Sequence, residues 1–322
     1  MRVFSKEFIK QFWKVILATF TGFIDDNGLK LSASLAYYTV FSIAPLLILV
    51  FSLISLLLGH DAINNNLYPQ IKEYVGSQAA VQIQEIVKKL QFSGKTGVAL
   101  ITGIIILLIG ASSMFVEIQD SLNIIWRVKA KPKRGWVKLV QNRFLSFSLI
   151  ISLGFLLLVS LIINIAISAL SVKLAHFLPG VTVLVLNVIN MVITLVVIAV
   201  LFGIIFKVLP DVKIRWANVR MGAIFTAVLF MGGQYLIGLY IKYTAQGSAY
   251  GAAGSIIIIL VWIYYSSAIL YIGAEFTEVY AEATGCNIVP AEYAVHVEQT
   301  EVEHVVEKLP PQNPQLEGNL KK

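Results

Sequence analysis

Residues 247–280 read GSAYGAAGSIIIILVWIYYSSAILYIGAEFTEVY, and this stretch decides the fold class. Its central run, from Ser255 to Ala274, contains no charged residue and ends at Glu275. A helix needs about twenty residues, at about 1.5 Å per residue, to cross the hydrocarbon core of a bilayer, which is about 30 Å thick. The stretch therefore predicts a membrane-spanning helix over residues 255–275 that carries hydroxyl and aromatic side chains.

The composition of the whole chain points to lipid as its solvent. The chain has 322 residues, of which 57% are hydrophobic and 13% are charged, and its mean hydropathy is +0.80. Soluble domains average about 45–50% apolar and about 25% charged residues. A soluble fold of this length could not cover so much apolar surface, so the composition excludes a soluble domain.

Residue types that carry chemistry are scarce. Cys286 is the only cysteine, and the four histidines are widely scattered, which excludes an internal disulfide and argues against a metal site. The sequence contains neither HExxH nor GxSxG. We therefore expect no enzyme activity, no catalytic residue, no metal and no cofactor. The net charge of +7 comes mainly from basic residues beside the apolar runs, so we expect membrane lipids and not nucleic acid as the partner.

Six apolar runs predict an all-α, polytopic membrane protein with a six-helix bundle. The expected spans lie at about 31–58, 97–116, 144–170, 181–206, 221–241 and 255–275, within a membrane domain of residues 31–285. Residues 1–30 are expected to form an amphipathic leader, residues 59–96 an extracytoplasmic cap, and residues 286–322 a flexible, polar and Pro-rich cytoplasmic tail.

The basic residues predict the orientation of these spans. If both termini are cytoplasmic, 19 Lys and Arg residues lie on the cytoplasmic side and 6 on the other side. Cytoplasmic loops carry an excess of Lys and Arg. The sequence therefore predicts cytoplasmic N- and C-termini in a multi-pass membrane protein.

The leader combines an apolar face with lysines. Its apolar residues recur at helical spacing, with Lys6, Lys10 and Lys14 on another face. This pattern is typical of a helix that lies on an anionic membrane surface. A leader packed on the helix bundle is the alternative. The apolar residues are Phe4, Phe8, Phe12, Ile16 and Phe20.

Polar and aromatic residues within the spans are candidates for lining a substrate path. Pro45 removes a helical hydrogen bond and is expected to kink the first span. Structural hydrogen bonding between helices is the alternative role for the polar members. The candidates are Tyr37, Tyr38, Ser42, Pro45, Gln234, Trp262, Tyr264 and Tyr265.

A second group of polar residues lies at the expected cytoplasmic ends of the spans. We expect these residues to form a polar vestibule that holds an anionic headgroup, with arginine as the forked donor to phosphate. Salt bridges that lock the bundle are the alternative. The vestibule residues are Glu117, Asp120, Asn123, Asp211, Arg215 and Glu275.

Three segments together resemble the YihY/BrkB family of bacterial inner-membrane proteins, formerly labelled ribonuclease BN-like and including the virulence factor BrkB. They are the run ASLAYYTVFSIAP at 33–45, the pair LNIIW at 122–126 and LPDVKIRW at 209–216, and the pair YGAAG at 250–254 and GAEF at 273–276. The resemblance covers about residues 20–285. It implies a six-helix inner-membrane protein and links some members to lipid movement. The old ribonuclease label finds no support, because closely spaced His and Asp ligands are absent.

Two functions remain open on these observations. The first is a transporter or permease for a lipid or other amphiphilic substrate, whose tails stay in the bilayer while the headgroup meets the polar side chains. The second is a non-enzymatic membrane scaffold or envelope-assembly factor that recruits a cytoplasmic protein partner of unknown identity. Either function is compatible with a homo-oligomer.

Overall fold

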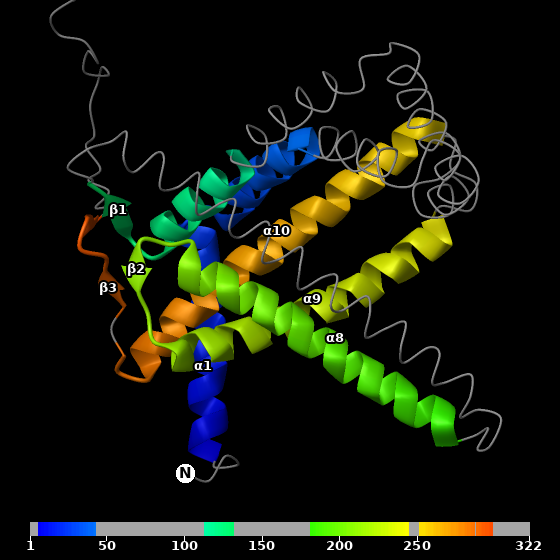
Figure 1. Ribbon diagram of the computed structural model, residues 1–322, viewed down its shortest axis with the longest axis horizontal. Coiled ribbons are helices and arrows are strands. Elements are labelled where there is room, and N and C mark those ends of the chain that lie inside the picture. The colour runs from blue at the N-terminus through cyan, green and yellow to red at the C-terminus, as the bar shows by residue number, and fades with distance from the viewer. Residues whose placement is uncertain (1–5, 43–112, 132–180, 245–250, 287, 299–322) are drawn as a thin grey trace, which may run out of the picture.

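The computed structural model describes residues 6–42, 113–131, 181–244, 251–286 and 288–298 (Figure 1). The described chain is mainly helical. Its helices are α1 (Lys6–Asp25), two segments at 28–42 and 113–125, α8 (Val181–Val208), α9 (Trp216–Thr244) and α10 (Gly251–Ala283). Four short strands accompany them, so the all-α prediction is right for the greater part of the described residues and not for all of them. The strands are β1 (Val128–Ala130), β2 (Val212–Lys213), β3 (Val289–Pro290) and β4 (Ala294–His296).

Two of the described helices contain runs that are long and apolar enough to cross a membrane. These runs are Val188–Val208, with 21 residues, and Trp216–Ile237, with 22 residues. Valine side chains along α8 point outward, as at Val188, Val192 and Val196, which suits contact with lipid chains. The predicted cap at 59–96, the kink at Pro45 and most of the first three spans lie outside the described residues. The six-span count and the orientation therefore stay predictions.

Helices α9 and α10 run antiparallel and approach each other closely at paired glycine and threonine residues. Gly222 of α9 lies against Thr277 of α10, and Gly273 of α10 lies against Thr226 of α9. A Cβ atom at either glycine would collide with the facing threonine. Each threonine hydroxyl donates a 2.7 Å hydrogen bond to the glycine carbonyl four residues earlier in its own helix. Small residues are what allow helix backbones to pack this closely in a bilayer.

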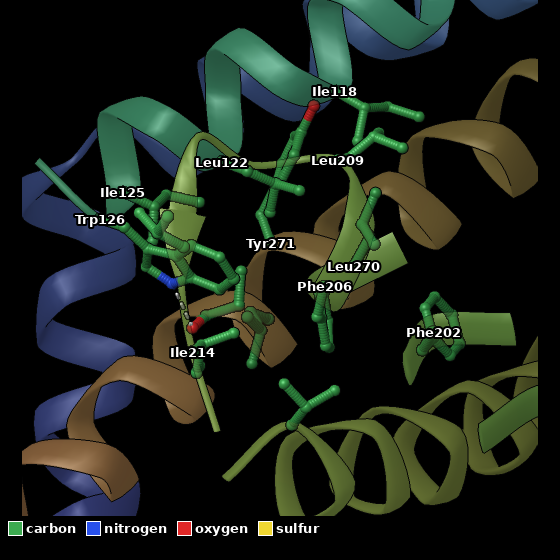
Figure 2. Packing of buried hydrophobic residues seen from close by; sticks show 14 of the residues in the cluster. Ile118, Leu122, Ile125, Trp126, Phe202, Phe206, Leu209, Ile214, Leu270 and Tyr271 are labelled. Carbon is green, nitrogen blue, oxygen red and sulfur yellow. Dashed lines mark hydrogen bonds between the residues drawn. The ribbon is translucent and has the colours of Figure 1, made fainter. Parts of the chain in front are cut away.

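A buried apolar cluster joins α8 and α10 to the 113–125 helix (Figure 2). Leu122, Phe206 and Tyr271 are fully buried within it. The cluster extends along α8 to Phe202, whose ring contacts Phe230 of α9 edge-on at 5.8 Å. A Cβ at Gly203 of α8 would lie 3.6 Å from the Cβ of Ala223 of α9, so α8 and α9 also pass close to each other. Phe23 of α1 and Leu35 of the 28–42 helix belong to the same cluster, so side chains from all six described helices form one core at one end of the helices.

Helix α1 packs along α10 and turns back into the next helix at residues 26–27. Asn27 adopts a left-handed backbone conformation, with φ of 57°, which asparagine tolerates better than most residues. Phe12 contacts Phe276 of α10 edge-on at 6.2 Å. The alternative of a leader packed on the bundle therefore holds for one face of α1. A second face is exposed and apolar, and it comprises Ile9, Trp13, Leu17, Phe20 and Ile24.

Residues 288–298 pair with the loops at this end of the helices, so this part of the predicted flexible tail is ordered, contrary to expectation. Strand β4 pairs antiparallel with β1, and β3 pairs antiparallel with β2. The strands gather at one end of the helices (Figure 1). Backbone hydrogen bonds add to the pairing, among them one of 2.9 Å from the Ala291 amide to the Asp211 carbonyl. Backbone pairing, which composition does not reveal, fixes the start of the tail.

We predict that the exposed apolar face of α1 contacts lipid. In a Cys286→Ser background, a nitroxide at residue 17 should be relaxed by lipid-dissolved oxygen, because Leu17 lies on this face. A nitroxide at residue 11, about 120° away around the helix, should instead respond to a water-soluble nickel chelate. Electron paramagnetic resonance of the protein in anionic vesicles measures both responses. Equal accessibility at the two positions would contradict a lipid-facing stripe.

We predict that Gly222→Ala and Gly273→Ala destabilise the helix pair by about 1–3 kcal/mol each, because the new methyl group meets a threonine at its Cβ as well as its hydroxyl. Gly232→Ala is the matched control, since no atom lies within 4 Å of a Cβ at that position. Its helix propensity should improve by about 1 kcal/mol. Thermal unfolding in detergent measures the three variants. A control that lost as much stability as Gly222→Ala would refute the close-packing explanation.

Candidate functional site

Three segments that are distant in sequence meet at one end of the helices: residues 122–127, residues 209–215 and residues 273–278. The Trp126 indole N–H donates a 3.1 Å hydrogen bond to the Ala274 carbonyl of α10 (dashed line in Figure 2). Trp126 is buried, and the chain turns sharply after it at Arg127, where φ is 53°. The indole therefore fixes the end of the 113–125 helix against α10.

A buried polar network connects the 113–125 helix to the loop between α8 and α9. The Asn123 side-chain amide donates to Asp211 Oδ2 at 2.9 Å, and Asn123 Oδ1 accepts from the Asp211 backbone amide at 2.9 Å. Gln119 Nε2 donates to Asp211 Oδ1 at 3.1 Å. All three residues are buried. Hydrogen bonds to both carboxylate oxygens and from the backbone amide hold Asp211 in one place.

Asp120 and Glu117 lie beside this network on the same helix. Desolvation raises the pKa of Asp120 above its ordinary value, and the negative charges of Glu117 and Asp211 raise it further. Asp120 is exposed, whereas Glu117 is half-buried. The network therefore has a negatively charged rim.

A second cluster lies where the end of α1 meets α10. The Glu275 side chain is only 3% exposed, and its Oε2 would lie 2.8 Å from a Cβ at Gly22. Asp26, in the turn directly after α1, places its carboxyl group within hydrogen-bonding reach of Glu275. Arg127 is the cation that acts electrostatically on Asp26, Glu275 and Glu278. The cluster therefore holds more carboxyl groups than cations among the described residues.

Burial governs the acid strength of this cluster. Desolvation raises the pKa of Asp26, and Asp25 adds to the rise, while Glu275 and Arg127 oppose it. Desolvation likewise raises the pKa of Glu278 to about 8, with Glu282 contributing and Arg127 opposing. A carboxyl group with a pKa of about 8, such as that of Glu278, exchanges its proton near neutral pH.

Comparison with known proteins identifies the chain at the level of its family. A family model described as Virulence factor BrkB matches residues 19–292. The chain belongs to the BrkB family. The match includes all three of the segments that meet at this end of the helices. It also extends through β3, which lies beyond the stretch that resembles the family by inspection.

Known relatives of this BrkB-family chain are named membrane proteins. A UPF0761 membrane protein of Pseudomonas aeruginosa (strain LESB58) is 30% identical over 257 residues, which cover 78% of this chain and 59% of that protein. A UPF0761 membrane protein of Tolumonas auensis is 28% identical over 292 residues, which cover 86% of each chain. The chain spans about six-tenths of the length of the Pseudomonas relative. No solved structure matches. The relatives and the apolar helices together make the chain a membrane protein.

The six vestibule residues occupy three separate places in the structure. Asn123 and Asp211 are in direct contact, with Glu117 and Asp120 beside them, while Glu275 lies in the cluster with Asp26. Arg215 is elsewhere: its guanidinium contacts Cys286 Sγ at 3.7 Å. This contact lowers the pKa of the Cys286 thiol. Among the described residues, no ion pair joins Arg215 to the carboxyl groups of the vestibule.

Among the candidate path residues, two on α10 are engaged with α9. Tyr265 donates a 3.0 Å hydrogen bond to the Leu229 carbonyl, and its phenol fills the space beside Gly233. The Trp262 ring contacts Phe230 edge-on at 5.6 Å. Tyr264 is half-buried. These contacts are those expected of packing residues.

The other path candidates lie apart from the contact between α9 and α10. Tyr37 and Tyr38 are exposed on the 28–42 helix, where their rings contact each other edge-on at 5.6 Å. Ser42 is buried, and its hydroxyl donates to the Tyr38 carbonyl at 2.8 Å. Gln234 lies on an exposed face of α9, and Pro45 lies outside the described residues. The described structure does not bring these residues together with the residues on α10.

Inspection of the sequence missed the role of Asp26, which reads only as part of a turn. Its signal was the run Asp25-Asp26 at a helix C-terminus, where a negative charge opposes the helix dipole. The Gly–Thr pairs were also missed. Their signal is the same four-residue spacing, Gly222 to Thr226 and Gly273 to Thr277, on two successive helices.

We predict that Asn123→Asp destabilises the protein by about 1–3 kcal/mol or more, because it places a second carboxylate against Asp211 and removes an amide donor. The double variant Asn123→Asp with Asp211→Asn should recover most of this loss, since the exchanged pair can remake all three hydrogen bonds of the network. Thermal unfolding of the two single variants and the double variant forms the test. Additive losses in the double variant would show that the network does not position this end of the helices.

Proposed function

We propose that this BrkB-family protein is a permease that moves a lipid or other amphiphile across the bacterial inner membrane, without catalytic residues or a cofactor. One observation carries the proposal. Along α8 and α9 the exposed side chains are largely apolar, whereas the buried carboxyl and amide groups of Gln119, Asn123, Asp211 and Glu275 lie in the segments that meet at one end of the helices. A protein with this division can leave lipid tails in the bilayer and offer polar partners to the headgroup alone.

The charge of the polar end favours a headgroup that carries a positive nitrogen. The rim at Glu117 and Asp120 is negative, and the cluster at Asp26 and Glu275 contains more carboxyl groups than cations. Arg215, the donor expected to bind phosphate, contacts Cys286 instead. Because opposite charges attract across a partly desolvated surface, a zwitterionic lipid suits the described residues better than the anionic one that the sequence suggested.

A scaffold is the second candidate, and the ordered start of the tail favours it. Strands β3 and β4 hold residues 289–296 against the loops, which leaves Glu292, Tyr293 and His296 exposed at fixed positions. A fixed polar surface next to the membrane is what recruitment of a cytoplasmic protein would need. Stoichiometric cross-linking to one protein in cells, together with no lipid movement in vesicles, would favour this function.

We predict that purified protein in vesicles accelerates the transbilayer movement of labelled phosphatidylethanolamine more than that of labelled phosphatidylglycerol. Asp120→Lys should reduce this preference, because it reverses a charge on the rim. Lys213→Gln is the matched control, since it breaks only an exposed 2.9 Å ion pair with Glu292. Reduction of the label by dithionite in the outer leaflet measures the movement.

Two results would count against the proposal. Rates of transbilayer movement equal to those of protein-free vesicles for every lipid would refute the permease function. Equal rates for the two headgroups, unchanged by Asp120→Lys, would remove the preference for a positive nitrogen while leaving the permease in place.

A further inference from the structure

The Glu275 side chain is buried without the partners that a carboxylate needs. Glu275 Oε1 is fully buried and makes no hydrogen bond among the described residues. Its other oxygen, Oε2, faces Gly22, where the absence of a side chain leaves room for it. Within the described part of the chain, no lysine or arginine forms an ion pair with Glu275. An isolated buried carboxylate is costly, and such a group generally becomes neutral.

The nearest polar neighbour of Glu275 is a second carboxyl group. Asp26 lies one helical turn after Gly22, whose carbonyl accepts from its amide at 2.8 Å, and its carboxyl group lies within hydrogen-bonding reach of Glu275. An ionised carboxylate is only an acceptor, so two carboxylates cannot hydrogen-bond each other, whereas a carboxylic acid can donate to a carboxylate. A hydrogen bond between Asp26 and Glu275 therefore needs a proton on one of the two groups.

The charges around the pair also favour retention of a proton. Asp25 and Asp26 stand at the C-terminal end of α1, which has no basic residue in its last turn. Glu278 and Glu282 follow on α10, whose last turn likewise lacks a basic residue. Helix C-termini carry a partial negative charge that disfavours further anions. Arg127, on the turn after the 113–125 helix, is the cation that opposes these charges.

We propose that Asp26 and Glu275 form a proton-binding site, in which one shared proton holds the end of α1 against α10. When the proton is present, the acid form of one group donates to the carboxylate of the other. When the proton leaves to water, two carboxylates remain in contact and repel each other, and the end of α1 separates from α10. The site is independent of which substrate the protein carries.

The direction of the pH dependence follows from the linkage between protonation and contact. The packed state binds the proton more tightly than the separated state, so the contact is fully stabilised at low pH. Its stability is lost as the pH rises from the ordinary carboxyl range, about 4, toward neutral and alkaline values. Any cation that replaced the proton would instead hold the contact at high pH.

The experiment measures the separation of α1 and α10 by pulsed electron resonance, with spin labels at residues 10 and 283 in a Cys286→Ser background. With Asp26 and Glu275 both present, the two labels should give a narrow distance distribution at about pH 5 that broadens toward about pH 9. Asp26→Asn should stay narrow at both values, because its amide donates to the Glu275 carboxylate without a titratable proton. Asp25→Asn is the matched control, since Asp25 is exposed and should leave the broadening in place.

A second measurement keeps the proposal testable if the distances do not change. Infrared difference spectra between the two pH values should show a protonated carboxyl component that both Asp26→Asn and Glu275→Gln remove, in addition to the component from Glu278, whose pKa is about 8. A spectrum that neither substitution changes would overturn the site. So would broadening in Asp26→Asn equal to that of the unmodified pair. If sodium ions restored the narrow distance distribution at high pH, the ligand of the site would be a metal cation and not a proton.

Discussion

The close approach of α9 and α10 at their paired glycines and threonines is the constraint on which the rest of the described structure depends. In a bilayer the lipid tails are as apolar as the side chains, so helices associate through close packing and hydrogen bonds. Gly222 with Thr277, and Gly273 with Thr226, provide that packing twice along one seam. Each threonine satisfies its own hydroxyl within its helix. The seam therefore needs no polar group from elsewhere.

This seam also sets the rotation of α10 about its axis. Successive residues of a helix point about 100° apart. Because Gly273 and Thr277 face α9, Glu275 must face a different side of α10. On that side lies α1, where Gly22 has no side chain and leaves room for the Glu275 carboxyl group. The Ala274 carbonyl is held on the side of the 113–125 helix, where Trp126 reaches it. Three consecutive residues of α10 thus serve three neighbouring segments.

The parts of the structure that follow from local sequence could be predicted. The parts that depend on contact between segments far apart in the sequence could not. Uncharged runs predict α8, α9 and α10 as helices and place Glu275 near the end of the last one, because span length depends on the chain alone. The pairing of Asn123 with Asp211 joins residues far apart in the sequence. The contact of Asp26 with Glu275 depends on how α1 packs. Strands of two or three residues, such as β2 and β4, carry too little pattern to be recognised.

The aromatic residues Trp262, Tyr264 and Tyr265 of α10 show why a polar residue in a span need not line a substrate path. The Tyr265 phenol fills the space between α9 and α10 beside Gly233, and the two Gly–Thr pairs fill it at two further positions along the helices. A headgroup cannot pass between α9 and α10 while these contacts hold. Within the described helices, polar side chains that remain exposed lie on outer surfaces, such as Gln234 on α9 and Tyr37 and Tyr38 on the 28–42 helix. A headgroup that moved along these helices would therefore pass over an outer surface, and α10 would form a fixed wall beside it.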